Sequence, residues 1–113
     1  MSKIYCKCGC WISDSTDGNP NKGLIISDKE YFNLLDMADE LIESTQNNRE
    51  ELAMKFRKNV CVGNECHIRL KQLFQCPECG RLLLENEDGE YHSFVQEDKY
   101  EFGLLDYKGN DFV

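Results

Sequence analysis

The sequence predicts an α+β fold: an antiparallel β-sheet with one long and one short helix inserted between two cysteine-containing turns. Three observations predict it. Cysteines cluster at residues 6–10 and again at residues 76–79. Residues 28–58 carry helical patterning, and short apolar runs separated by turn signals follow the second cluster. For 113 residues we expect a single domain over 1–113, with the helical insertion at about 28–58.

The clearest secondary-structure signal lies in the first half of the chain. Residues 13–22 are rich in turn formers, and the apolar run 23–27 predicts a strand. Ser27 and Glu30 have the spacing of a capping box. The helical spacing that follows predicts an amphipathic helix over 28–45. We interpret its apolar stripe as core, with an exposed docking face as the alternative; the stripe comprises Tyr31, Leu34, Leu35, Ala38, Leu41 and Ile42.

The second half predicts a shorter helix and then strands. Asn48 can cap the helix, which has acidic residues near its start and basic residues near its end. Residues 68–75 predict a strand, 81–84 a return strand and 91–95 a third strand. Glu87-Asp88-Gly89 suits the turn between the last two. Two alternatives stay open for residues 100–107: a fourth strand or a packed tail.

The turn Cys76-Pro77-Glu78-Cys79-Gly80 is the most specific feature of the sequence. Two thiolates separated by two residues can bind one tetrahedral metal ion from a tight turn. Pro77 restricts the turn, and Gly80 permits a backbone conformation that directs N–H groups at the sulfurs. The turn therefore predicts half of a metal site.

The other half must come from elsewhere, because a structural zinc site has four protein ligands. Cys6 and Cys8 are the predicted pair, since Cys8 is followed by glycine as Cys79 is. Cys8 with Cys10 is the alternative pair. A third possible source is Cys61 and Cys66 with the adjacent His67, although we interpret these two cysteines as free, buried or half-buried thiols.

Zinc is the expected metal, and iron is the alternative because tetrahedral all-thiolate sites accept either. Four cysteine ligands leave no open coordination position, which is typical of structural sites. The sequence contains only two histidines and no phosphate-binding glycine loop, HExxH or GxSxG motif. We therefore predict that the protein is not an enzyme.

The run Cys76-Pro77-Glu78-Cys79-Gly80-Arg81 resembles the knuckle of zinc ribbons and rubredoxin-like folds. Together with Cys6-x-Cys8-Gly9 and Ile12-Ser13-Asp14, it is similar to small bacterial zinc-ribbon proteins, over about the first quarter of the chain and residues 74–95. The resemblance implies a zinc-ribbon-like sheet. Some proteins of this kind look like immunity partners of bacterial toxins. The first turn is one residue shorter than in rubredoxins, which argues against electron transfer by iron.

The charge is strongly negative and uneven. The net charge is -8, and residues 84–113 hold nine acidic residues against two lysines. This balance disfavours nucleic acid and anionic membranes, and it favours a basic protein partner. The N-terminus has no secretory h-region, and no segment approaches the roughly 20 apolar residues that cross a bilayer. A cytoplasmic location is the expectation.

Two functions follow from these features. The first is a non-enzymatic, zinc-stabilised, acidic protein-binding module, with toxin immunity as the role that the resemblance implies. The alternative is a transcription-associated or nucleic-acid-binding zinc ribbon. Its support is a set of basic and aromatic residues near the second cysteine turn that suit phosphates and base stacking: Arg69, Lys71, Phe74, Arg81 and Tyr91.

Overall fold

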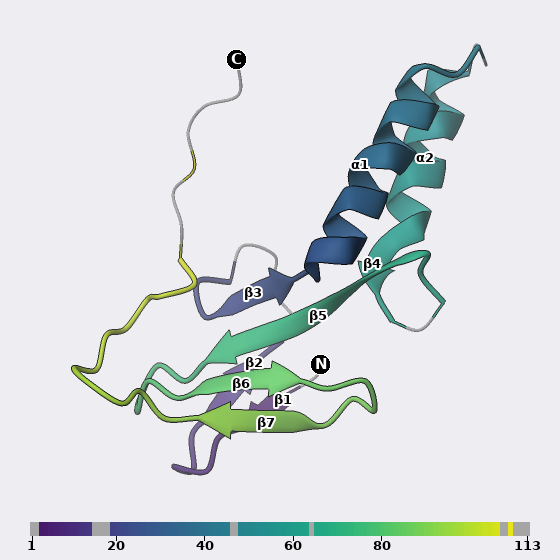
Figure 1. Cartoon of the computed structure of the whole chain (residues 1–113). Coiled ribbons are helices and arrows are strands. Elements are labelled where there is room, and N and C mark those ends of the chain that lie inside the picture. Colours follow the sequence, from purple (N-terminus) through teal and green to yellow (C-terminus); the bar gives the residue numbers. More distant parts are fainter. Residues whose placement is uncertain (1–2, 15–18, 46–47, 64, 107–108, 110–113) are drawn as a thin grey trace. The chain divides into compact units, whose positions relative to one another are not determined.

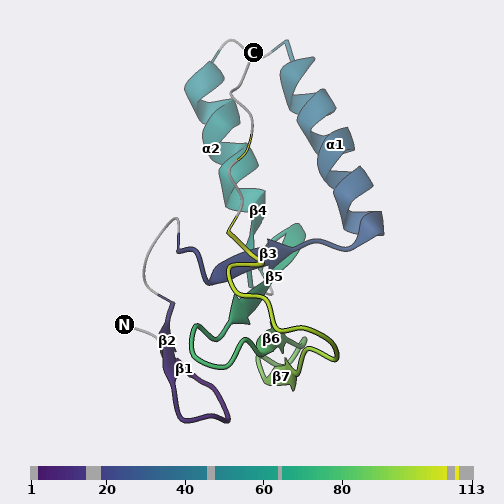
Figure 2. The ribbon, with the colours of Figure 1, turned by 90° about the vertical axis from the view of Figure 1, so that its left-hand side faces the viewer.

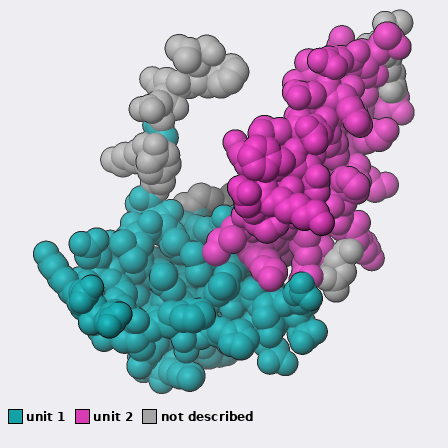
Figure 3. Space-filling view, viewed as in Figure 1, with its two compact units in different colours: residues 1–24, 72–113 teal, residues 25–71 magenta. Residues whose placement is uncertain are grey.

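A computed structural model of the chain describes residues 3–14, 19–45, 48–63, 65–106 and 109. It has the mixed α+β content that the sequence predicts. The chain forms two compact units, residues 1–24 with 72–113 and residues 25–71, shown in different colours in Figure 3. The second unit interrupts the first in sequence and contains the predicted helical insertion.

The first unit begins with a β-hairpin that the sequence pattern did not predict. Strands β1 (Lys3–Tyr5) and β2 (Trp11–Ser13) pair antiparallel, with Ile4 opposite Ile12. Because side chains alternate across a strand, Ile12 is buried on one face. Tyr5 and Trp11, which are opposite each other, lie exposed on the other face.

A larger, five-stranded sheet contains four strands in the order β3-β5-β6-β7, with a fifth strand paired to β5 (Figure 1). These are β3 (Lys22–Ile25), β5 (Ile68–Gln75), β6 (Leu82–Glu85) and β7 (Tyr91–Phe94), each within two residues of its predicted bounds. The last three strands pair antiparallel. Asn86 shapes the β6–β7 turn, because its side-chain oxygen accepts the N–H groups of Asp88 and Glu90, both at 2.9 Å.

The core of the first unit combines residues from both hairpins. Its buried residues are Cys6, Ile12, Phe74, Cys76 and Leu83. The ring of Tyr91 packs edge-on against Phe74, with 5.7 Å between ring centroids. Two of these five buried residues are cysteines, so the apolar core and the cysteine turns are one continuous structure.

The segment after β7 packs as a tail, the second of the two expected alternatives; it contains no strand over residues 96–106, and residues 107–108 lie outside the described part. Gln75, only 1 % exposed, holds it. The Gln75 side-chain amide donates to the Glu101 carbonyl at 2.8 Å and accepts the Leu104 N–H at 2.9 Å. Gln96 adds a second clamp, exchanging two 2.8 Å hydrogen bonds with the Glu101 backbone.

The second unit contains two antiparallel helices, α1 (Asp28–Ile42) and α2 (Arg49–Asn59) (Figure 2). Both predicted N-caps are confirmed: Ser27 Oγ accepts the Glu30 N–H at 3.2 Å, and Asn48 Oδ1 accepts the Glu51 N–H at 3.1 Å. Helix α1 ends three residues before the predicted boundary at 45. Among the described residues, no helix has the length and apolar character needed to cross a membrane.

The interpretation of the α1 stripe as core is wrong for much of it. Helix α1 has no buried residue. Leu34, Ala38 and Leu41 are half-buried, whereas Leu35 and Ile42 are 42 % and 71 % exposed. The stripe is wider than the single helix α2 can cover.

Strand β4 (Val60–Val62) follows α2 and pairs with the first half of β5 in parallel, an addition to the expected antiparallel sheet. Cys61 in β4 and Cys66, shortly before β5, lie at a Cα–Cα distance of 5.7 Å and form a disulfide. The expectation that both remain free thiols is therefore wrong. The physical reason is that the chain must reverse twice within a few residues, which places the two cysteines in disulfide range.

Alkylation mapping tests this pairing. Unfolded in a chelator without reductant, the chain should have five reactive thiols and one intact Cys61–Cys66 linkage. Replacing both cysteines by serine should lower the free energy of unfolding of the oxidised protein by about 2 kcal/mol, because the closed loop is short. Urea unfolding of the two proteins measures this difference, and seven reactive thiols in the wild-type chain would contradict the pairing.

Tyr91 gives a spectroscopic probe of the first core. Burial, and next the charge of Glu85, raise the pKa of its phenol to about 12. Its hydroxyl donates to Gln72 Oε1 at 2.9 Å. Because the pKa is raised in the folded state, the associated stability is present below pH 10 and is lost as the pH rises towards 12.

An ultraviolet titration should therefore find one of the five tyrosines ionising about two pH units late. In Tyr91→Phe this late step should disappear. Simultaneous ionisation of all five in the folded wild-type protein would contradict the packing described for Tyr91.

Candidate metal centre

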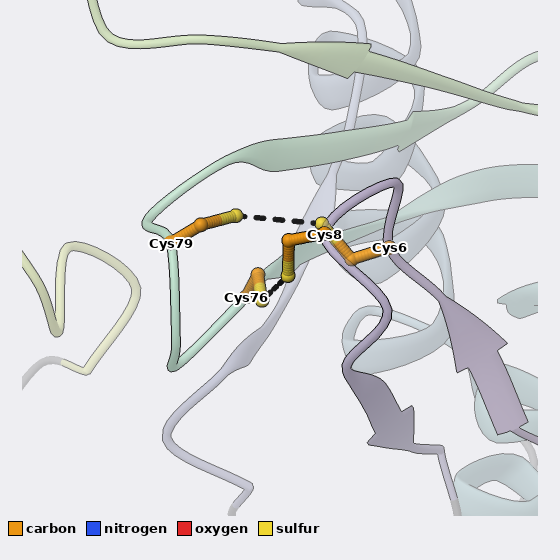
Figure 4. A group of neighbouring side chains, drawn as sticks. All are labelled: Cys6, Cys8, Cys76 and Cys79. Carbon is orange, nitrogen blue, oxygen red and sulfur yellow. Dashed lines mark hydrogen bonds between the residues drawn. The ribbon is translucent and has the colours of Figure 1, made fainter.

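Four sulfur atoms meet where the two cysteine turns of the first unit face each other (Figure 4). The Sγ atoms of Cys6, Cys8, Cys76 and Cys79 all lie within 4.8 Å of one another. Cys6 Sγ is 3.4 Å from Cys79 Sγ, and Cys8 Sγ is 3.6 Å from Cys76 Sγ. A tetrahedral zinc ion with Zn–S bonds of about 2.3 Å requires sulfurs about 3.8 Å apart, so the donor set fits this ion.

The first turn joins β1 to β2 and presents Cys6 and Cys8. The Cys6 N–H donates to the Cys10 carbonyl at 2.9 Å, and the Gly9 N–H donates to the Cys6 carbonyl at 3.0 Å. Gly9 has a φ of 96°, a conformation that favours glycine. These bonds fold the chain back within four residues, so one spacer residue is enough to direct both thiols to the same side.

The second turn joins β5 to β6 and has a similar hydrogen-bond pattern with one more residue. The Cys76 N–H donates to the Arg81 carbonyl at 2.9 Å, and the Gly80 N–H donates to the Cys76 carbonyl at 3.0 Å. Gly80 has a φ of 78°, and a Cβ there would lie 2.9 Å from Gln96 Nε2. Gly80 therefore serves both the turn and the attachment of the tail.

Hydrogen bonds to the sulfurs offset the cost of burying negative charge. Burial raises the pKa of the Cys76 thiol, and the N–H groups of Cys79 and Glu78 oppose this. Burial likewise raises the pKa of Cys6, and the Cys8 N–H opposes it. Such N–H groups stabilise thiolates and hold them in place for a metal.

Cys79 is the thiol that ionises first. Burial opposes its ionisation, but the Arg81 N–H and hydrogen bonds from Cys6, Cys8 and Cys76 lower its pKa to about 6. The Arg81 guanidinium adds a bond from Nη1 to Cys79 Sγ at 3.4 Å. For Cys8, the Cys10 N–H favours the thiolate, but burial and the Cys76 thiol leave its pKa raised. The cluster thus holds a thiolate at neutral pH, and metal binding would displace the remaining protons.

The other candidate ligands lie outside this cluster. Cys10 is half-buried, and its thiol donates to the Trp11 carbonyl at 3.4 Å. Cys61 and Cys66 are joined to each other in the second unit, and His67 beside them is exposed. Of the alternatives that the sequence left open, the structure brings together Cys6 and Cys8 with the second turn.

The residues named for nucleic-acid binding are only partly accessible. Phe74 is completely buried, so the expectation that it stacks on bases is wrong. Tyr91 is half-buried against Phe74, and Arg81 donates to a cysteine sulfur. Arg69 and Lys71 are half-buried. The strand alternation of residues 68–75 contained the signal, because it places Phe74 on the apolar face.

Sequence reasoning missed the role of Arg81 beside Cys79 and the two glutamines that hold the tail. A basic residue directly after Cys-x-x-Cys-Gly was a usable signal for the role of Arg81. Gln75 and Gln96 gave none, since their partners are backbone groups of residues 80, 101 and 104.

Comparison with known proteins gives one match. A family model described as "Domain of unknown function (DUF8617)" matches residues 2–98. No curated protein and no solved structure matches the chain.

Proposed function

Because the chain belongs to the DUF8617 family, whose description names no function, we propose one from its own geometry: a non-enzymatic, Zn²⁺-stabilised module that binds a basic protein partner. The observation that carries the proposal is the cluster of four cysteine sulfurs within 4.8 Å. Four protein sulfurs complete a tetrahedral shell, so a bound Zn²⁺ would have no position for substrate or water. Cys6, Cys8, Cys76 and Cys79 would act as a structural clamp between two hairpins.

An acidic surface on the first unit supports the choice of a basic partner. Exposed carboxylates lie along the β6–β7 turn and along the tail: Glu87, Asp88, Glu90, Glu97, Asp98 and Glu101. Carboxylates spaced along a rigid turn can match a basic surface and accelerate association. A toxin that acts on nucleic acid has such a surface, and an immunity role in the cytoplasm, with the carboxylates replacing phosphates, is the most specific form of the proposal.

Affinity capture with a charge-reversed variant tests the partner. Glu87, Asp88 and Glu90 are replaced by lysine, while Glu85 is kept because its carboxylate receives the Tyr91 hydroxyl at 3.5 Å. Wild-type protein should capture a protein of high pI, and the triple variant should bind it at least about tenfold more weakly at low salt.

The matched control reverses three acidic residues on the second unit, Asp36, Glu40 and Glu43, and should bind like wild type. The acidic surface would not be the binding site if the β6–β7 variant bound the partner as tightly as wild type. The same conclusion would follow if both variants lost the same amount of affinity. Zinc content is measured on every variant, so loss of the metal clamp is distinguished from loss of the partner.

One observation favours the alternative of nucleic-acid binding. Tyr5 and Trp11 lie side by side on the exposed face of the β1–β2 hairpin, and Lys3 Nζ lies 4.5 Å from the centroid of the Trp11 ring. Exposed aromatic rings beside lysines suit single-stranded bases. Trp11 is the one tryptophan of the chain, so tryptophan fluorescence reports directly on binding at this hairpin. Salt-sensitive quenching by a single-stranded oligonucleotide would favour this function, and unchanged fluorescence would count against it.

A further inference from the structure

Helices α1 and α2 of the second unit leave an apolar groove on one face. The groove has a volume of about 440 Å³. It is lined by Ala38, Leu41, Ile42, Arg49, Leu52, Ala53, Phe56 and Arg57. Six of these eight side chains are apolar, and the two arginines both come from α2.

The apolar surface continues from the groove along α1. Tyr31, Leu35, Ala38 and Ile42 follow one another at intervals of four, three and four residues, so they form one stripe on the helix. The exposed fractions of Tyr31, Leu35 and Ile42 are 45 %, 42 % and 71 %. Leu34 and Leu41, which are half-buried, lie on the neighbouring stripe. Helix α1 therefore has the wide apolar face of a bundle helix with only part of it covered.

The two sides of this face carry opposite charges. On α1, Asp28 and Asp39 fall beside the exposed stripe at helical spacing. On α2, Arg49 and Arg57 line the groove, and Glu50 lies beside Ala53 at helical spacing, so the α2 side is basic on balance. Within the described part of the chain, no ion pair joins Asp39, Arg49 or Arg57 to another residue. Arg49 lines the groove together with Ala38 and Ile42, the residues that lie on either side of Asp39 in the sequence of α1.

We propose that this face binds the same face of a second copy of the chain, forming an antiparallel four-helix bundle from two helical hairpins. Identical faces can pair about a two-fold axis in two ways. An axis along the helices stacks α1 on α2 of the partner copy and puts acidic beside basic side chains. An axis across the helices stacks α1 on α1 and opposes like charges. The charge pattern selects the first arrangement, which is also the packing of simple helical bundles.

Sedimentation velocity of the full chain, loaded with zinc, tests the dimer. Wild-type protein should sediment at twice the 13.1 kDa of one chain at micromolar concentration. Ile42→Asp should sediment as one chain with unchanged helical circular dichroism, because a residue 71 % exposed contributes little to the fold of one copy. Met54→Asp is the matched control: Met54 is also 71 % exposed but lies on the opposite side of α2 from Leu52, and its variant should remain dimeric.

A charge swap tests the selected axis. Arg49→Glu should weaken the dimer about tenfold by placing two acidic groups together. Adding Asp39→Arg to the same chain should restore the dimer affinity to within about threefold of wild type. In the double variant, each residue 49 and the residue 39 of the other copy have exchanged the signs of their charges, so they attract again. Neither change opposes its helix dipole, since Arg49 begins α2 and Asp39 lies in the second half of α1.

A wild-type chain that stays monomeric at millimolar concentration would overturn the proposal. So would an Ile42→Asp variant that still dimerises, and failure of the double variant to recover would overturn the axis along the helices. The surface proposed for the basic partner is in the other unit, so these results leave that proposal separately testable.

Discussion

Replacing Cys76 by alanine is expected to abolish zinc binding and to unfold the first unit. Cys76 is completely buried, and its sulfur is one of the four in the cluster. Binding of Zn²⁺ to structural sites contributes on the order of 10 kcal/mol, more than a core of five buried residues of this kind can replace. Elemental analysis should find one zinc per wild-type chain and much less than one per Cys76→Ala chain.

Cys10→Ala supplies the matched control, because Cys10 lies four residues from Cys6 but belongs to no sulfur contact of the cluster. This variant should keep one zinc and a thermal unfolding midpoint close to that of wild type. Removal of metal by a chelator should reproduce the Cys76→Ala phenotype in the wild-type protein. A wild-type chain that holds no metal and is unaffected by chelation would contradict the metal centre.

Phe74→Ala should be the most destabilising change that leaves every cysteine in place. The ring is completely buried between the hairpins and packs against Tyr91. Truncation of such a residue removes apolar contacts and leaves a cavity, which costs about 3–5 kcal/mol. Urea unfolding of the zinc-loaded protein should show this loss as a lower midpoint.

Phe94→Ala is the appropriate comparison, since Phe94 is 52 % exposed on the neighbouring strand β7. Its replacement should change the unfolding free energy by less than about 1 kcal/mol. Equal effects of the two substitutions would contradict the assignment of Phe74 to the core. Zinc content should stay at one per chain in both, which separates packing from metal binding.

Local signals explain why much of the fold was predictable. The caps at Ser27 and Asn48 depend on side chains within three residues of the groups they satisfy. The turns after residue 85 depend on Asn86 and Gly89, again at short range. By contrast, β1, β2 and β4 are three residues long and are defined by their pairing partners. So few residues provide no periodicity to detect.

The uncovered stripe of α1 was missed for a related reason. Apolar residues at helical spacing predict a face that is buried somewhere, without saying by which element. Here α2 is only 11 residues long and offers Leu52 and Phe56 as its main apolar contacts. The same argument applies to the Cys61–Cys66 disulfide, because it depends on the parallel pairing of β4 with β5.

All four cysteines of the cluster were predicted from the sequence, although only the glycine after Cys8 favoured Cys6 and Cys8 over the alternative pair. The Cys76–Cys79 spacing fits a two-ligand turn by itself, whereas Cys6, Cys8 and Cys10 alternate evenly and their spacing favours no pair. The structure separates them because the chain reverses at Gly9, so Cys10 already belongs to the return path and bonds to its neighbour Trp11. Backbone geometry, and not the choice of residue type, decides which of the three cysteines joins the cluster.

The amide of Gln75 makes residues beyond the last strand part of the fold. A protein cut after residue 98 would retain all the strands and helices of the described residues and all seven cysteines. It would nonetheless leave this buried amide without the partners it finds at Glu101 and Leu104. An unsatisfied buried polar group costs about 1–3 kcal/mol, and Gln75 directly precedes Cys76. The autonomous unit therefore extends past its last strand, and expression boundaries drawn from secondary structure alone would produce a weakened protein.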